Sequence, residues 1–295
     1  MVVAATGFFD GVHLGHKVVL DKLKAVAAAE GKESAVITFW PHPRNVLQKD
    51  AHLLRLLNSI KEKEELVKSY GIDHLYVIEF TKEFSQLTTE EFLRECLVKK
   101  YNVSSLIVGY DHRVGRDDIQ GPLHILDVAK KVGVKTYMTE PLDIDDNIIS
   151  STKIRNVLKE GMVEEATKLL GYRYPLTGVV VSGNMIGRTI GFPTANMQLY
   201  EPIKMVPRNG VYVVDVYVLG KKFIGICNIG NRPTVSSNNG LTIETNILDF
   251  NENIYGLDIR IDFVQKIRDE KKFASLDLLK EQLKKDAIYA RNCLK

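Results

Sequence analysis

The chain has 295 residues, of which 45% are hydrophobic and 26% are charged. This length and composition predict a globular protein of about two domains and exclude disordered, collagen-like and coiled-coil chains. The 40 basic and 37 acidic residues leave a formal charge of +3, which is too small to favour nucleic acid or a membrane surface as the main partner.

Cysteine usage and the N-terminus bear on where the protein acts. Cys96, Cys227 and Cys293 lie far apart and form no C-x-x-C pair, which favours a reduced intracellular protein without structural zinc. The N-terminus lacks the basic segment of a signal peptide, and no apolar run approaches the roughly 20 residues of a membrane span. We therefore expect a cytoplasmic protein, a monomer or weak oligomer, that acts on small molecules and binds neither nucleic acid nor membranes.

The first part of the chain alternates β-branched runs with amphipathic stretches. The runs predict buried strands at 2–5, 34–39, 74–80, 104–108 and 134–138. The amphipathic stretches predict helices at 14–30, 59–70, 89–101 and 123–131. This alternation predicts βαβ units, and hence an N-terminal Rossmann-like α/β domain with a parallel sheet. Ligands of such folds bind at the carboxyl ends of the strands, so we expect functional residues in the segments that follow them.

The pattern changes near residue 171, where we place the boundary between domains 1–171 and 172–295. Two helices predicted at 152–159 and 163–170 precede it. Runs of period 2 then predict an antiparallel sheet or small barrel, with strands at 176–181, 211–218, 223–226, 242–250 and 258–264. Ser275 is a predicted N-cap of a last helix, with Leu276, Leu279 and Leu283 on one face. All 7 histidines precede residue 125, so the two halves are expected to carry out different chemistry.

One candidate site is the segment Gly7-Phe-Phe-Asp-Gly-Val-His-Leu-Gly-His16, which follows the first strand and opens the first helix. His13 and His16 are three residues apart and share a helix face. A helix N-terminus offers free N–H groups to a phosphate, and two imidazoles there could donate further hydrogen bonds. The alternative is a surface histidine pair. Three glycines allow the backbone to pass close to a ligand: Gly7, Gly11 and Gly15.

A second element of this half is Ile149-Ser-Ser-Thr-Lys-Ile-Arg155, which opens another predicted helix. Its hydroxyl groups lie near the free N–H groups of the helix start, and Arg155 can bind a phosphate through two donors. The alternative is an ordinary N-cap followed by a solvated basic face.

These two motifs, with Phe39-Trp-Pro-His-Pro43 between them, resemble the adenylyltransferase module of the bacterial bifunctional riboflavin kinase/FAD synthetases, within the nucleotidyltransferase superfamily. The resemblance implies that domain 1–171 adenylylates FMN with ATP to give FAD and pyrophosphate. Such an in-line transfer needs positioning and charge stabilisation but no protein nucleophile. The implied catalytic residues are His13, His16 and Arg155. The implied phosphate contacts are Gly7, Phe8, Asp10, Gly11, Gly15, Ser151 and Thr152. The implied flavin contacts are His42 and Asp111.

The segment Gly109-Tyr-Asp-His-Arg-Val-Gly115 departs from the G-x-D/N-F-x-F-G pattern of that family. Asp111 keeps the polar position, but His112 and Val114 replace both phenylalanines. If this loop contacts the flavin, the loss of aromatic stacking predicts weaker FMN binding in this half.

The second half has a glycine-containing loop, Gly183-Asn-Met-Ile-Gly-Arg-Thr-Ile-Gly-Phe-Pro-Thr-Ala-Asn196. Its spacing and Arg188 exclude a Walker A motif. Its backbone amides can still bind phosphates, and Thr194 with Asn196 offers oxygen ligands for Mg²⁺. A polar β-turn is the alternative.

A kinase without histidine needs a carboxylate to accept the proton of an alcohol. The candidates are Asp215, Glu244, Asp249, Glu252 and Asp258. Glu244 is favoured because it shares a strand face with Thr242 and Asn246, which we expect to be a polar face inside a small barrel. An exposed strand face is the alternative.

Several motifs of this half resemble the riboflavin kinase module: G-R-x-x-G-F-P-T-A-N, Asn209-Gly-Val-Tyr212, Asn228-x-Gly-x-x-Pro-Thr234, the Glu244 strand and Arg268-Asp-Glu-Lys-Lys-Phe273. The resemblance implies a six-stranded antiparallel β-barrel with a C-terminal helix. It implies that Glu244 is the base for the ribityl hydroxyl and that Thr194 and Asn196 bind Mg²⁺. The implied ATP contacts are Gly183, Gly187, Arg188, Pro193 and Thr194, and the implied flavin contacts are Asn209 and Arg268.

The sequence therefore predicts an enzyme that phosphorylates riboflavin to FMN and adenylylates FMN to FAD, with ATP and Mg²⁺ in both steps. Two alternatives stay open. One is a riboflavin kinase with a weak or inactive adenylyltransferase half, and the other is a non-catalytic flavin-binding regulator.

Overall fold

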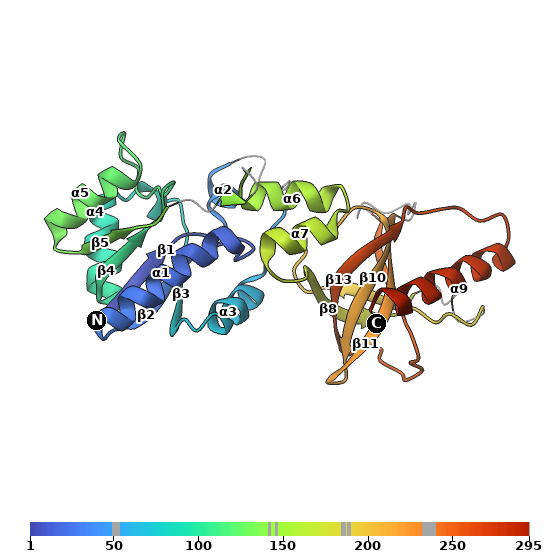
Figure 1. Ribbon diagram of the computed structural model, residues 1–295. Coiled ribbons are helices and arrows are strands. Elements are labelled where there is room, and N and C mark those ends of the chain that lie inside the picture. Colours follow the sequence, from blue (N-terminus) through green and yellow to red (C-terminus); the bar gives the residue numbers. More distant parts are fainter. Residues whose placement is uncertain are drawn as a thin grey trace. The chain divides into compact units, whose positions relative to one another are not determined.

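The computed structural model forms two compact units, Met1–Ser151 and Thr152–Lys295 (Figure 1). The structure describes residues 1–48, 54–140, 143–144, 147–183, 187, 190–231 and 240–294. Within these residues, no helix has the length and apolar character needed to cross a membrane. Residues 152–171, which the sequence analysis assigned to the first domain, group with the second unit by their contacts. The boundary at residue 171 stays a prediction.

The first unit is built on a parallel sheet of five strands in the order β3-β2-β1-β4-β5. The predicted parallel sheet is therefore confirmed. Its strands are β1 (Val2–Thr6), β2 (Glu33–Trp40), β3 (His74–Glu79), β4 (Val103–Val108) and β5 (Lys135–Met138). Its helices are α1 (Leu14–Glu30), α2 (Pro43–Leu47), α3 (Ile60–Ser69), η2 (Phe84–Gln86), α4 (Thr89–Glu91), the π-helical η3 (Phe92–Lys100) and α5 (Pro122–Val132). The sequence analysis did not predict α2, η2 or the short hairpin of β6 (Asp143–Ile144) and β7 (Asn147–Ile148).

Helices cover both faces of this sheet. Alternate residues of each strand point to opposite faces, so each strand contacts helices on both sides. Val3 and Ala5 pack with α1 and α3, whereas Val2 and Ala4 pack with η3 and α5. The β-branched runs that the sequence analysis predicted to be buried strands therefore carry apolar side chains on both faces. The strand order reverses between β1 and β4, and a crevice at such a point is the usual ligand site of open α/β sheets.

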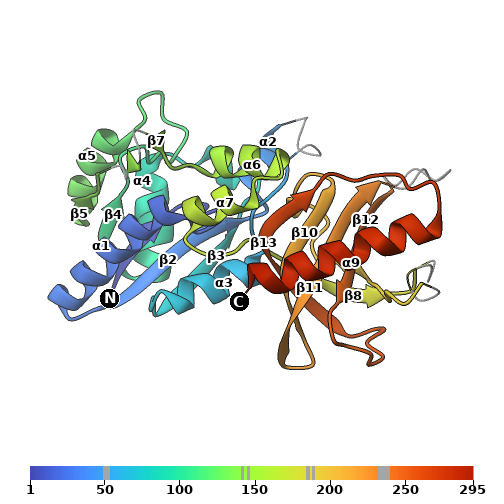
Figure 2. The same cartoon turned by 45° about the vertical axis from the view of Figure 1, so that its right-hand side comes forward.

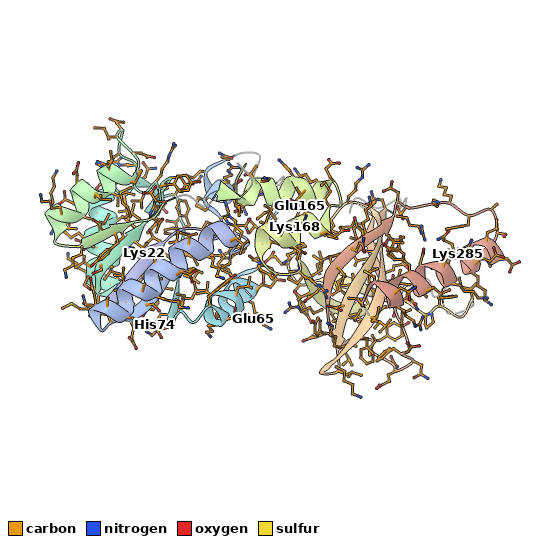
Figure 3. The ribbon with its side chains drawn as sticks, viewed as in Figure 1. Lys22, Glu65, His74, Glu165, Lys168 and Lys285 are labelled. Atoms are coloured by element: carbon orange, nitrogen blue, oxygen red, sulfur yellow. The ribbon has the colours of Figure 1, made fainter. Side chains whose placement is uncertain are left out.

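The second unit begins with helices α6 (Ser151–Lys159) and α7 (Val163–Leu170), followed by a closed barrel of six strands. On α7, Lys168 pairs with Glu165 one turn earlier at 3.2 Å (Figure 3). The barrel order is β10-β11-β12-β9-β8-β13, and all its ladders are antiparallel, as predicted. Its strands are β8 (Pro175–Val181), β9 (Ala195–Leu199), β10 (Gly210–Val218), β11 (Lys221–Asn231), β12 (Leu241–Ile247) and β13 (Asp258–Arg268).

The C-terminal helix α9 (Leu276–Cys293) lies across the outside of the barrel (Figure 2). Ser275 caps it as predicted, since the Ser275 hydroxyl accepts the N–H of Leu278. The predicted apolar face is wrong at its start: Leu276 is 56% exposed. The helix is anchored mainly by its later turns, where Ala287 and Ala290 pack on the barrel, so its first turn has no core to cover.

Two candidate active sites

His13 and His16 stack on each other at the N-terminus of α1, with ring centroids 3.6 Å apart and planes 17° apart. His13 is the N-cap, and its Nδ1 atom accepts the backbone N–H of His16 at 3.3 Å. Because Nδ1 accepts a hydrogen bond, the proton of the neutral ring is on Nε2, which is then a donor. Gly15 permits this packing, since a Cβ there would lie 3.1 Å from the His13 ring.

His16 is held neutral by its surroundings. Burial lowers its pKa well below the ordinary value, and the nearby His13 and Lys63 lower it further. Its Nδ1 atom is buried, and no described residue offers it a hydrogen-bond partner. A buried imidazole nitrogen beside a helix N-terminus is a polar group that a bound phosphate can satisfy.

The loop before these histidines has an unusual backbone. Phe9 and Val12 have φ of 50° and 36°, in the left-handed region that side chains disfavour, and Gly11 has φ of 85°. The carboxylate of Asp10 accepts the N–H of Leu57 at 2.9 Å, and thereby fastens the loop to the segment before α3. Asp10 is 4% exposed, so the structure shows it supporting the loop.

The structure brings the two motifs of this half together. The hydroxyl of Ser151 donates to the carbonyl of Asp10 at 2.9 Å, although 141 residues separate them. A Cβ on Gly15 would also lie 3.3 Å from the carbonyl oxygen of Ile149. Thr152 and Arg155 follow on α6 and group with the second unit, so their predicted phosphate contacts stay predictions.

Further predicted residues lie at the carboxyl ends of β1, β2 and β4. His42 packs edge-on against Phe8, with centroids 4.1 Å apart, and caps α2 through Nδ1. His112 Nε2 lies 2.9 Å from the Thr6 hydroxyl, across the point where the strand order reverses. Asp111, the residue before His112, is exposed. Val114 packs against the core of the sheet.

In the second unit, strand register aligns one row of residues on one barrel face. Arg268 of β13 is opposite Val211 of β10, which is opposite Asn228 of β11. Asn228 is opposite Glu244 of β12, which in turn is opposite Asn196 of β9. Directly opposed residues of antiparallel strands point to the same side. Three predicted residues, Arg268, Glu244 and Asn196, therefore share a face with Asn228, to which the sequence analysis gave no role.

The predicted position of this polar face inside the barrel is wrong. Thr245 and its partner Cys227 are 1% and 0% exposed and point to the interior, so the adjacent Glu244 points outward. On that outer face of β11, Ile226 packs with α9. The interior positions on these strands are taken by Thr245 and Cys227, so the Glu244 carboxylate lies on the outer face.

A cavity of about 410 Å³ opens beside Thr194. Its walls are mostly apolar, with a few polar groups, which suits a planar ring carrying a polar chain. The lining residues include Val180, Pro193, Ala195, Ile247, Phe250, Glu252 and Tyr255. The amide of Asn246 donates to the Pro193 carbonyl at 2.7 Å and so fixes the loop at its rim.

Two glycines shape the loop before β9. A Cβ on Gly183 would lie 2.2 Å from the side-chain nitrogen of Asn196, so only glycine leaves space for that amide. A Cβ on Gly187 would lie 2.2 Å from the Phe192 carbonyl oxygen. Arg188, a predicted ATP contact, lies outside the described residues, as does the end of the Asn228–Thr234 motif.

The two predicted flavin contacts of this half have protein partners. Arg268 forms an ion pair with Asp286 of α9 at 2.8 Å, and its guanidinium lies 5.8 Å from the Phe273 ring. The Asn209 amide lies 3.5 Å from a Glu270 carboxylate oxygen. Arg268 therefore joins the barrel to α9, whatever contact it makes with a flavin.

Lys63 was missed by the sequence analysis. It is fully buried on α3 and lies against the loop that carries His13. The sequence does contain a signal that Lys63 is buried. Lys63 falls on the apolar stripe of Ile60, Leu66 and Val67, and a lysine on such a stripe needs a polar partner.

Comparisons with known proteins agree with the division of the chain into two functional halves. The FAD synthetase family matches residues 1–153, and the riboflavin kinase family matches residues 170–294. The chain belongs to the bifunctional riboflavin kinase/FMN adenylyltransferase family. The relative from Listeria monocytogenes is 39% identical over 96% of this chain and 90% of its own length. The relative from Bacillus subtilis is 38% identical, with the same coverage.

A solved structure has the same fold throughout. It is described as a macrolide-efflux protein from Streptococcus pneumoniae, has a TM-score of 0.90 and 34% identity, and matches over 99% of this chain and 94% of its own. The bifunctional interpretation is confirmed, and neither alternative function is favoured.

Proposed function

We propose that the second unit phosphorylates riboflavin to FMN and that the first unit adenylylates FMN to FAD. The observation that carries the kinase assignment is the row in which Glu244 of β12 lies opposite both Asn196 of β9 and Asn228, while other residues of β9 and β12 line the cavity beside Thr194. This row offers a base and polar groups on the outer face, and the strands β9 and β12 border a space of the size and character of a nucleotide site.

In the kinase reaction Glu244 accepts the proton of the ribityl 5′-hydroxyl as that oxygen attacks the terminal phosphate of ATP. Thr194 and Asn196 hold Mg²⁺, which neutralises phosphate charge when bound. The donor set fits, because the cradle beside Gly183 keeps the Asn196 amide in place. No cluster of three or more histidine, cysteine or acidic groups suited to a metal occurs among the described residues, which suits an ion that arrives with ATP.

In the adenylyl transfer, His13 and His16 stabilise the triphosphate as the pyrophosphate leaves. Their stacking, the Nε2 proton of His13 and the adjacent helix N-terminus support this role. Ser151, Thr152 and Arg155 complete the phosphate contacts, and His42 and Asp111 contact the flavin. The cytoplasmic location, the monomeric or weakly oligomeric state and the absence of nucleic-acid partners stay predictions.

The test is a single assay on the full chain. Purified protein is incubated with riboflavin and Mg-ATP, and the flavins are separated by chromatography. We expect FMN to appear first and FAD to follow, and EDTA to stop both steps. Formation of FMN without FAD would support the kinase assignment alone, and no conversion would refute both.

A further inference from the structure

Lys63 is a buried cation with a defined set of partners. Its ammonium donates to the Phe8 carbonyl and to the Thr38 hydroxyl at 3.2 Å, and it lies 3.9 Å from the centre of the Phe8 ring. Thr38 donates to the same carbonyl at 3.1 Å. Figure 3 labels the exposed Glu65 on the same helix, whereas Lys63, two residues earlier, is 0% exposed.

These contacts act on the loop that carries the histidines. Phe9 and Val12 hold disfavoured backbone conformations, so the loop needs external restraint to stay in this shape. The Ser151 hydroxyl bonds to the Asp10 carbonyl. Two further restraints are the bond from Leu57 to the Asp10 carboxylate and the bond from Lys63 to the Phe8 carbonyl. Both restraints end on α3 or the segment before it, so this part of the chain acts as a support for the loop.

We infer that Lys63 is a positioning residue for adenylyl transfer, and that its ammonium holds the Phe8–Val12 loop in the shape that presents His13 and His16. The inference rests on the proposed function of the first unit. Lys63 is too deeply buried and too fully bonded to reach a substrate, so it acts through the loop. Burial lowers the pKa of Lys63 to about 8, and the Asp10 carboxylate opposes this effect, so the ammonium stays charged at pH 7.

The experiment compares Lys63→Met and Lys63→Gln with Lys61→Met, which removes an exposed lysine from the same helix. Methionine keeps the stem but loses every donor, whereas glutamine keeps an uncharged N–H donor. In the full chain we expect Lys63→Met to lower kcat for FAD formation by about 10²-fold, the cost of a misplaced catalytic group. Lys63→Gln should fall between Lys63→Met and wild type. KM for FMN and the kinase activity of the same sample should stay within twofold.

A second readout does not depend on turnover. The charge of Lys63 helps to lower the pKa of His16, so Lys63→Met should raise that pKa in an NMR titration of the imidazoles, while Lys61→Met should not. If the wild-type chain makes no FAD, the proposed function fails, and this titration still tests Lys63.

Two results would overturn the inference. One is wild-type kcat in both folded Lys63 variants together with an unchanged His16 pKa. The other is unfolding of the first unit in both variants, because Lys63 would then be needed for the fold and not for the site. If only Lys63→Met unfolds, the inference is tested on Lys63→Gln alone. A lowered kcat of Lys63→Gln with unchanged KM for FMN supports the inference, whereas a wild-type kcat overturns it.

Discussion

The Thr6 hydroxyl and His112 Nε2 lie 2.9 Å apart and join the carboxyl ends of β1 and β4. Burial lowers the pKa of His112 to about 4, so the ring is neutral at pH 7 and holds this bond without charge. This loop position is thus tied to the sheet by a polar contact. The His112 ring is therefore held at the crevice where a ligand is expected.

His112→Phe should lower KM for FMN in FAD formation by about fivefold and leave KM for ATP unchanged. The physical reason is that an added aromatic contact contributes on the order of 1 kcal/mol, and 1.4 kcal/mol is about tenfold in affinity. Initial rates at varied FMN measure the effect. Thr6→Val breaks the same hydrogen bond without adding a ring and is the control. An equal fall of KM in Thr6→Val would mean that release of the loop, and not stacking, is responsible.

His13→Ala combined with His16→Ala should abolish FAD formation and leave riboflavin phosphorylation intact, because only the first site loses its phosphate donors. Since the pKa of His16 lies well below its ordinary value, this residue stays neutral between pH 7 and pH 6. Its titration should therefore not change the rate of FAD formation over that range. Chromatographic assays of both products test this, and normal FAD formation by the double variant would disprove the assigned role.

Glu244→Gln should lower the rate of FMN formation by about 10²-fold or more, because the shape is kept but the base is lost. Adenylylation of supplied FMN should continue at the wild-type rate. Asp249→Asn, which changes an exposed carboxylate outside the cavity lining, is the matched control. Equal loss of both activities would indicate that Glu244 supports the structure of the whole chain.

If Thr194 and Asn196 hold Mg²⁺ as proposed, Thr194→Ala and Asn196→Ala should each raise the concentration of Mg-ATP needed for half-maximal kinase rate, since each would remove an oxygen ligand. The melting temperature should change little, because the side chains are partly exposed. Kinase assays at varied Mg-ATP, with calorimetry on the same samples, separate the two effects. A large drop in melting temperature would favour a turn-forming role instead.

Asp286→Asn should destabilise the second unit by about 3 kcal/mol, because it removes the fully buried carboxylate that pairs with the partly buried Arg268 guanidinium. Asp269→Asn is the control, since Asp269 is 74% exposed in its pair with Lys266 and should cost little. Calorimetric unfolding measures both variants. Similar stability of the two would show that the Arg268–Asp286 pair does not hold α9 on the barrel.

The local sequence pattern was sufficient to predict most of the secondary structure. The β-branched runs and amphipathic stretches predict all five strands of the parallel sheet, and α1 and α7 at their observed bounds. β9 was missed because its polar residues, among them Asn196 and Gln198, do not form an apolar run. β11 and β13 are longer than predicted because ladder pairing in a closed barrel continues past the apolar residues.

The sequence by itself determined the two-part organisation, the motifs and the types of group at each site, because these depend on composition and on residues near one another in the chain. Tertiary structure decided which groups meet. Only the fold shows that Ser151 bonds to Asp10, that Glu244 points out of the barrel, and that Arg268 pairs with Asp286. These contacts join residues far apart in the chain, and their energies depend on burial and strand register, which no local pattern contains.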